Sequence, residues 1–267
     1  MVEVPVRAGH TQGVTRIGDG ESTLSRVIRI FETFDSDRPQ MTVSGIARRS
    51  GLHVATTSRL IEQLVGYGWL QRVPNRGLQV GVRMWELASR ASPTLGLRDA
   101  ALPYMEDLHA VLGHHTQLGI LEGEEVLFVE RLTAPAAVIN YTRVAGRLPL
   151  HASSSGLVLL AHSPSSLQEK IRGGPLKTYT DQTIATAPEL RAALADVRRQ
   201  GYAFCQGHIH ELATGIAVPL REPAGSVVAA LAVIVPNDGA AFGKIPALQA
   251  TARGIVRAMS GATKPIP

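Results

Sequence analysis

A short arginine-bearing stretch at residues 51–70, GLHVATTSRLIEQLVGYGWL, combines an apolar helical repeat with small hydroxyl side chains. At about 100° per residue, the inward face holds Thr57, Leu60, Ile61 and Leu64, and the outward face holds Ala55, Arg59 and Glu62, flanked by Thr56, Ser58 and Gln63. Short outward side chains let the backbone approach a partner closely. An arginine can donate two hydrogen bonds to a base edge, and hydroxyls can donate to phosphates. The stretch therefore indicates a recognition helix for the major groove of DNA.

The sequence around this helix predicts the elements that would position it. A first helix starts at Thr23, with apolar residues at helical spacing: Leu24, Val27, Ile28, Phe31 and Phe34. Thr42 can cap a short second helix over residues 43–49, and the turn Ser50–Gly51 leads into the third helix, expected over residues 53–65. Two alternating runs, WLQRV and LQVG, flank the turn PNRG and predict a β-hairpin. This order is that of a winged helix-turn-helix.

The charge of the chain favours an anionic partner for this region. Residues 1–90 contain 12 Arg, no Lys and 8 Asp+Glu, a net charge of +4, whereas the remaining residues contain 15 basic and 14 acidic side chains, a net charge of +1. Arg76 lies at the hairpin tip, where it can reach a phosphate or the minor groove. The candidate DNA-binding residues are Ala55, Thr56, Ser58, Arg59, Arg76 and Ser44. A winged helix that binds another protein is the alternative.

Length and composition limit the number of domains and indicate the cellular compartment. The 267 residues suffice for two domains, and the single cysteine, Cys205, excludes an intramolecular disulfide. The longest apolar run, VVAALAVIV at residues 227–235, is shorter than the roughly 20 residues that a membrane-spanning helix needs. The N-terminus lacks the apolar segment of a signal peptide. We therefore expect a cytoplasmic protein without a membrane partner.

The patterns along the chain predict a two-domain α+β architecture. The expected segments are a flexible arm over residues 1–21, the winged helix-turn-helix over 22–80, a linker helix over 81–96, an effector-binding domain over 97–260 and a tail over 261–267. Residues 92–96 are expected to form a joint. In the larger domain, strand-like runs at 116–122, 125–132, 136–144, 201–207, 213–220 and 226–236 alternate with helical patterns at 97–113, 155–162, 165–172, 187–200 and 243–260. The strands are expected to form one central antiparallel sheet.

Several of these motifs together resemble the IclR family of bacterial transcriptional regulators. The resemblance covers about residues 22–260 and includes TLSRVIRIFETF, RLPLHASSSGLVLLA at residues 147–161 and GYAFCQGHIHELATGIAVPL at residues 201–220. It implies a winged helix-turn-helix, a linker helix and a ligand-sensing domain, assembled as dimers or dimers of dimers on operator DNA. It also implies that the outward residues Ala55, Thr56, Ser58 and Arg59 face the DNA.

The stretch from Leu148 to Gly156 is the candidate effector site. It leads from a strand into a helix, where the unpaired backbone N–H groups of Ser154 and Ser155 favour an anion such as a carboxylate. Taken alone, the serines are better interpreted as a helix cap; the family resemblance implies that they grip the effector. No G-x-S-x-G motif is present, so the pattern does not favour a serine hydrolase.

Further effector contacts follow from the resemblance. Relatives that sense small oxo acids tend to have polar side chains at the positions of Cys205, Gly215, Ala232 and Ile234, which here are small or apolar. Polar groups buried unpaired in such a lining would each cost roughly 1–3 kcal/mol. We therefore expect an apolar or aromatic acid, amide or hydrazide-like effector, with Asn140 as a polar contact from the adjacent strand.

The histidines suggest a competing metal site. His208 and His210 could share a strand face near Cys205, and His114, His115 and His151 are further donors. No familiar ligand spacing is present, so we expect neither a metal ion nor a cofactor.

These observations predict a ligand-responsive transcriptional regulator, not an enzyme. We expect a homo-oligomeric repressor whose two recognition helices lie about 34 Å apart on a palindrome-like operator. Two other classes remain open: a small-molecule-converting enzyme that uses the α+β domain, and a winged-helix protein that does not bind DNA.

Overall fold

The structure is a computed structural model that describes residues 21–35, 37–134 and 142–262. The described residues form two compact units, which divide between Leu95 and Gly96. Each unit has an apolar core of its own, as is usual for separate domains.

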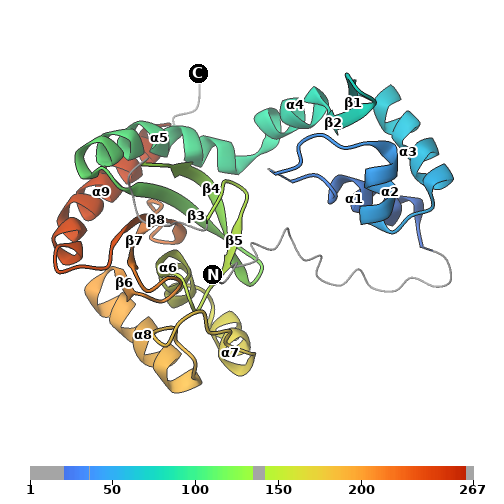
Figure 1. Ribbon diagram of the computed structural model, residues 1–267. Helices are drawn as coiled ribbons and strands as arrows, with labels where there is room; N and C mark the ends of the chain where they lie inside the picture. The colour runs from blue at the N-terminus through green and yellow to red at the C-terminus, as the bar shows by residue number, and fades with distance from the viewer. Residues whose placement is uncertain (1–20, 36, 135–141, 263–267) are drawn as a thin grey trace. The chain divides into compact units, whose positions relative to one another are not determined.

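The smaller unit consists of three helices, a two-stranded hairpin and a fourth helix (Figure 1). These elements are α1 (Thr23–Phe31), α2 (Val43–Ser50), α3 (Val54–Gly66), β1 (Leu70–Val73), β2 (Gly77–Val80) and α4 (Val82–Ala91). The predicted cap of α2 is confirmed, because the Thr42 side chain accepts a hydrogen bond from the backbone N–H of Gly45. Gly51 follows α2 with φ 66°, a left-handed conformation that glycine adopts at little steric cost, and so makes the turn into α3.

The core of this unit lies where the helices meet the hairpin. Its buried residues are Ile30, Ile46, Leu60, Ile61, Leu64, Leu70 and Leu78. Met41 forms an isolated bridge with Leu78, which ties the segment before α2 to β2. The inward face predicted for α3 therefore holds this helix against the rest of the unit.

The segment between α4 and the following helix is shorter than the joint expected over residues 92–96. A single non-helical residue, Ser92 with ψ 115°, separates the two helices, and α5 (Pro93–Leu112) starts at the next residue. Proline suits the first position of a helix because its φ is already helical and its missing N–H is not needed there. Pro103 lies in the interior of α5, where it cannot donate to the carbonyl four residues earlier.

The larger unit is built around a six-stranded antiparallel sheet in the order β5-β4-β3-β8-β7-β6. Its strands are β3 (His115–Glu122), β4 (Glu125–Leu132), β5 (Arg147–Pro149), β6 (Ala203–Gln206), β7 (Ala213–Arg221) and β8 (Val227–Pro236). The accompanying helices are α6 (Ser154–Ala161), α7 (Ser165–Gly173), α8 (Ala187–Gln200), η1 (Ala241–Lys244) and α9 (Ile245–Ala262). The predicted fold class, a winged helix-turn-helix followed by an α+β domain with a central antiparallel sheet, is confirmed.

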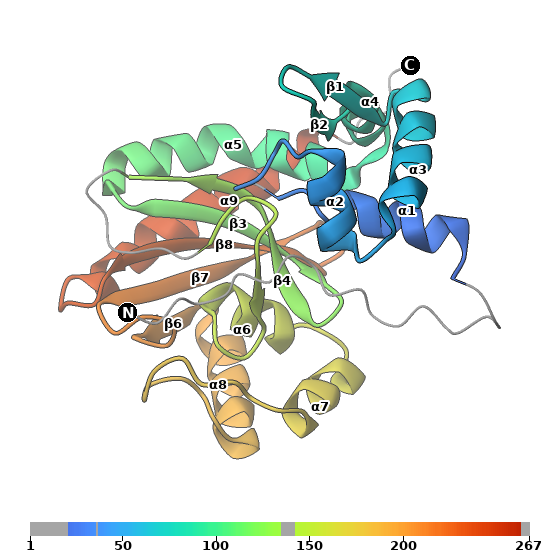
Figure 2. The ribbon, with the colours of Figure 1, turned by 45° about the vertical axis from the view of Figure 1, so that its right-hand side comes forward.

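Helices cover both faces of this sheet, α5 and α9 on one side and α6 and α8 on the other (Figure 2). The α5 and α9 side packs on Leu231 and Val233 of β8, whereas the α6 and α8 side packs on Ala230 and Ala232. Successive side chains of a strand point to opposite faces, so a strand buried on both faces forms a continuous apolar run. This explains the run at residues 227–235. Among the helices that the structure describes, none is long and apolar enough to cross a membrane.

The strand predicted over residues 136–144 is not found in the part of that range that is described. Residues 142–146 form an irregular turn region, in which the N–H of Gly146 donates to the Arg143 carbonyl at 2.9 Å and Ala145 has φ 62°. The unpredicted strand β5 follows and pairs with β4. Its three residues are too few to produce an alternating pattern. The remainder of the predicted strand lies outside the described residues.

Candidate nucleic-acid interface and ligand cavity

The outward face of α3 is open to solvent. Ala55 and Arg59 are exposed, and Thr56 and Ser58 are half-buried. The inward face is buried and consists of Thr57, Leu60, Ile61 and Leu64. Arg59 makes no hydrogen bond or ion pair with any residue in the described part of the chain, so its guanidinium is available to a ligand.

The start of α3 contains two residues that the sequence pattern did not single out. The helix begins at Val54, one residue later than expected, because His53 is the N-cap and its Nδ1 accepts from the backbone N–H of Ala55 at 3.3 Å. Val54 keeps 52% of its surface exposed. An exposed apolar side chain beside Ala55 can contact the methyl group of thymine. The one sequence feature that could have identified Val54 as a DNA-contacting residue is its position directly after the helix cap.

The hairpin ends in a turn with a distinctive backbone. Asn75 and Arg76 have φ 61° and 59°, and the N–H of Gly77 donates to the Pro74 carbonyl at 3.3 Å. Two left-handed residues in succession are typical of a type I′ turn, whose twist matches that of the flanking strands. Arg76 is exposed. This conformation is sterically unfavourable for an arginine, so the turn keeps a cation at its tip at some cost in backbone energy.

Two further side chains complete this surface. Ser44 is exposed on α2, with its Oγ 3.1 Å from Thr42 Oγ1. Glu62, the acidic residue on the outward face of α3, forms an ion pair with Arg72 of β1. Because this pairing neutralises the carboxylate, Glu62 repels an approaching phosphate less than a free carboxylate would.

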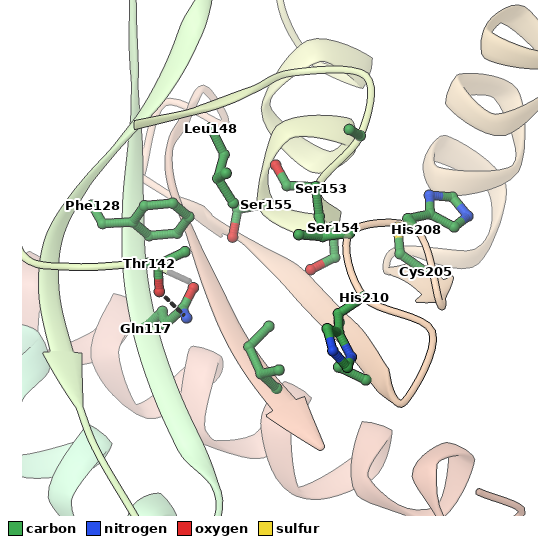
Figure 3. A pocket seen from close by; sticks show the side chains of 15 residues that line it. Gln117, Phe128, Thr142, Leu148, Ser153, Ser154, Ser155, Cys205, His208 and His210 are labelled. Atoms are coloured by element: carbon green, nitrogen blue, oxygen red, sulfur yellow. Dashed lines mark hydrogen bonds between the residues drawn. The ribbon is translucent and has the colours of Figure 1, made fainter. Parts of the chain in front are cut away.

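The larger unit contains a cavity between the sheet and the start of α6 (Figure 3). The space between its lining residues, open solvent included, is about 510 Å³. Its polar lining residues are Gln117, Thr142, Ser153, Ser154, Ser155, His208 and His210. Its other lining residues are Phe128, Leu148, Ala152, Cys205, Ile209, Ala213, Gly215 and Ile234. Most of the wall is therefore apolar, with polar groups at a few places.

The start of α6 supplies hydrogen-bond donors to this cavity. Ser153 caps the helix, since its Oγ accepts from the N–H of Gly156 at 3.1 Å. The N–H groups of Ser154 and Ser155 lie in the first turn and have no acceptor within the helix. The partial positive charge at a helix start favours an anion at such groups. The arrangement can hold a carboxylate.

Two glycines allow α6 to lie this close to the sheet and to its own leading loop. A Cβ on Gly215 would lie 2.8 Å from Ser154 Oγ, and a Cβ on Gly156 would lie 2.4 Å from the Leu150 carbonyl oxygen. Gly156 is therefore a packing residue and not part of the cavity wall. The room that Gly215 leaves is occupied in part by the Ser154 side chain.

The structure gathers six of the nine predicted effector-binding residues around the cavity: Leu148, Ser154, Ser155, Cys205, Gly215 and Ile234. It does not place Gly156 or Ala232 in the wall. Ala232 is fully buried in the core between the sheet and α6. Asn140 lies outside the described residues.

Sequence reasoning missed several residues of the cavity. Gln117 of β3 is only 1% exposed, and its Nε2 donates to Thr142 Oγ1 at 2.5 Å. Phe128 of β4 supplies an aromatic wall, and His208 and His210 lie on the loop between β6 and β7. In Figure 3, Gln117 and Thr142 lie across the cavity from His208 and Cys205. The available signal for Gln117 was an amide in the middle of an apolar strand.

Burial shifts the pKa of two side chains in the cavity wall, His208 and Cys205. Burial lowers the pKa of His208, and the nearby His151 lowers it further, so the ring is neutral at pH 7. His208 Nδ1 is buried without a hydrogen-bond partner among the described residues. Burial raises the pKa of the Cys205 thiol to about 12, so it remains protonated. The described wall thus presents no negative charge to an acidic ligand.

The competing metal site finds no support in the geometry. Within the described ranges, no three His, Cys, Asp or Glu side chains come together in a way that could hold a metal ion. The ring of His151 donates from Nε2 to the Lys177 carbonyl at 2.9 Å, which ties this histidine to the loop after α7.

Comparisons with known proteins agree with both halves of this description. Residues 23–74 match the IclR helix-turn-helix domain, and residues 90–260 match the bacterial transcriptional regulator IclR C-terminal domain. An IclR homolog from Microbacterium hydrocarbonoxydans, solved in complex with 4-hydroxybenzoate, is 43% identical, with a TM-score of 0.87 over 90% of this chain and 100% of that chain.

Two curated relatives are regulators as well. The HTH-type transcriptional regulator XynR of Escherichia coli K12 is 29% identical over 213 residues, 79% of this chain and 84% of XynR. The Pca regulon regulatory protein of Pseudomonas putida is 26% identical over 228 residues, 85% of this chain and 78% of that protein. The helix-turn-helix, the sheet with its cavity and these matches agree, and the chain belongs to the IclR family of bacterial transcriptional regulators.

Proposed function

We propose that this regulator is a homo-oligomeric repressor whose affinity for a palindromic operator changes when an aromatic carboxylic acid occupies the cavity. The observation on which this rests is the cavity wall. It combines the free N–H groups at the start of α6 with an apolar lining that includes Phe128, Leu148 and Ile234. A planar apolar ring with one anionic end satisfies both parts of such a wall.

The relative from Microbacterium hydrocarbonoxydans supports this effector class, because its structure contains 4-hydroxybenzoate. The lining disfavours small oxo acids. Such acids carry a second carbonyl group, and Cys205, Gly215 and Ile234 supply no strong hydrogen-bond donor for it. An aromatic amide or hydrazide would place only a neutral carbonyl oxygen at the start of α6. The positive end of a helix favours the charged acid over it.

In this proposal the operator is read by the exposed surface of the smaller unit. Arg59 contacts a base edge from α3, with Ala55, Thr56 and Ser58 beside it, and Val54 adds an apolar contact in the groove. Ser44 and Arg76 contact phosphates on either side of the recognition helix. Two such surfaces, about 34 Å apart on a dimer, would match successive major-groove turns.

Apolar surface on the same unit supports an oligomer. Leu24 of α1 is 67% exposed, and Val82 and Trp85 of α4 are 63% and 69% exposed. None of the α4 residues is buried within the chain. Large apolar side chains left exposed on a helix favour association, and a second copy of this chain is the simplest partner.

The two sites would communicate through α5. This helix packs on the sheet through Met105 and Leu108, and it starts at Pro93, directly after α4. A ligand that shifts the sheet would therefore move the helix that connects to the association surface. Such coupling requires that the effector binds two states of the oligomer with different affinities.

A mobility-shift assay with the DNA upstream of this gene tests the proposal. We expect salt-dependent retardation that 4-hydroxybenzoate alters and glyoxylate leaves unchanged. Transcription from that promoter in vitro should decrease with added protein; an increase would make the protein an activator. A response to glyoxylate alone would overturn the aromatic assignment. Absence of retardation together with turnover of the aromatic acid would favour the enzyme alternative.

A further inference from the structure

Gln117 is a buried polar side chain in the cavity wall with one amide atom unused. The residue is 1% exposed, and its Nε2 donates to Thr142 Oγ1 at 2.5 Å. No described residue donates to its Oε1, and Figure 3 shows the amide at the edge of the open space that Ser154 and Ser155 also face. This oxygen can therefore accept a hydrogen bond from a ligand in the cavity.

Neighbouring residues hold the Gln117 side chain in place. Arg131 donates from Nη1 to the carbonyl oxygen of Thr142, and the Thr142 hydroxyl holds the Gln117 Nε2. Arg131 lies directly opposite Gln117 in the β3–β4 register. A β-bulge between Leu118 and Gly119 shifts this register and so turns Arg131 toward the α6 face of the sheet, while Glu130 pairs with Arg98 of α5 on the other face.

The strand register separates Gln117 from the N–H groups of Ser154 and Ser155, where a carboxylate would bind. Gly215, which lies under Ser154, is opposite Ile234, and Ile234 is opposite His115. Gln117 is two residues further along β3 on the same face. Two strand spacings and two residues separate the positions of Gly215 and Gln117 by about 12 Å. The two positions thus lie apart on the same face of the sheet, so one ligand can meet both only if its polar groups stand at different ends.

We propose that Gln117 selects the effector by accepting a hydrogen bond from a donor at the end of the aromatic ring opposite the carboxylate. The effector class is thus a para-hydroxy or para-amino aromatic acid. This inference rests on the proposed function, since it assumes an aromatic acid whose carboxylate lies at the start of α6.

Calorimetric titration of the full-length protein tests the assignment with a ligand pair that differs in one group. Wild type should bind 4-hydroxybenzoate about tenfold more tightly than 4-methylbenzoate, which has the same shape but no donor. Gln117→Met keeps the side-chain length and removes the acceptor, so it should bring the ratio to about one or below while 4-methylbenzoate still binds. Gln200→Met, at the exposed end of α8, is the matched control and should keep the wild-type ratio.

The possible results are distinct. If 4-methoxybenzoate, which can only accept, binds wild type as tightly as 4-hydroxybenzoate, Gln117 does not act as an acceptor. If the tenfold ratio persists in Gln117→Met, another residue reads the hydroxyl, and this inference fails while the proposed effector class stands. If none of the benzoates binds wild type, the proposed effector class and this inference fail together. Binding of 4-methylbenzoate to Gln117→Met shows that the variant has folded with its cavity intact.

Discussion

Gly215→Ala tests how closely α6 approaches the sheet at the ligand cavity. The added Cβ would lie 2.8 Å from Ser154 Oγ, 3.4 Å from Ser154 Cβ and 3.5 Å from Ile234 Cδ1. The last two distances are close to ordinary van der Waals contact, whereas the first requires a movement. Because Ser154 Oγ can rotate, the strain is that of one displaced rotamer with limited overpacking, about 1–2 kcal/mol.

The expected cost appears in the thermal unfolding of the larger unit. For a unit of this size, a loss of 1 kcal/mol lowers Tm by about 2–4 °C, so Gly215→Ala should lower it by several degrees. The displaced Ser154 hydroxyl would also enter the cavity and weaken binding of 4-hydroxybenzoate. Calorimetry should follow the transition of the larger unit separately, since a two-domain chain need not unfold in one step.

A double-mutant cycle isolates the contact. Ser154→Ala removes the clashing oxygen, so the double variant should recover about 1 kcal/mol relative to the sum of the single changes. Gly173→Ala is the matched control, because a Cβ there meets nothing within 4 Å. Additive costs in the cycle, or an equal loss from Gly173→Ala, would refute the contact between Ser154 and Gly215 and with it this account of the cavity wall.

Three further outcomes follow from the same structure. Arg59→Ala should weaken operator binding by roughly 1–3 kcal/mol in fluorescence anisotropy, whereas Arg90→Ala on α4 should not; unchanged affinity would remove Arg59 from the reading surface. Burial lowers the pKa values of His151 and His208, so the unfolded chain binds more protons as the pH falls below about 6.5. Calorimetric Tm should therefore drop between pH 7.5 and 5.5, and a constant or rising Tm would contradict this. Cys205, whose pKa burial raises to about 12, should resist iodoacetamide at pH 8 until the protein unfolds, with labelling followed by mass spectrometry; rapid native labelling would mean an open thiol.

Local features of the chain were predictable because helical periodicity and capping involve residues close in sequence. The inward face of α3, the Thr42 cap and the serines at the start of α6 all follow from spacings of three or four residues. Helix ends were less certain. α3 starts at Val54 because the ring of His53 caps it, and α5 starts at Pro93 because proline fits the first turn of a helix. The spacing of apolar residues reveals neither of these causes.

The amino-acid sequence by itself determined the order of elements, the exposed arginine on the recognition helix and the family to which the chain belongs. Only the tertiary structure decided which residues share the cavity. Gln117 enters its wall because β3 pairs with β8 in a particular register, and Ala232 leaves it because that residue lies in the core beneath α6. Strand register joins residues far apart in sequence, and a shift of one residue would exchange the two faces of the sheet.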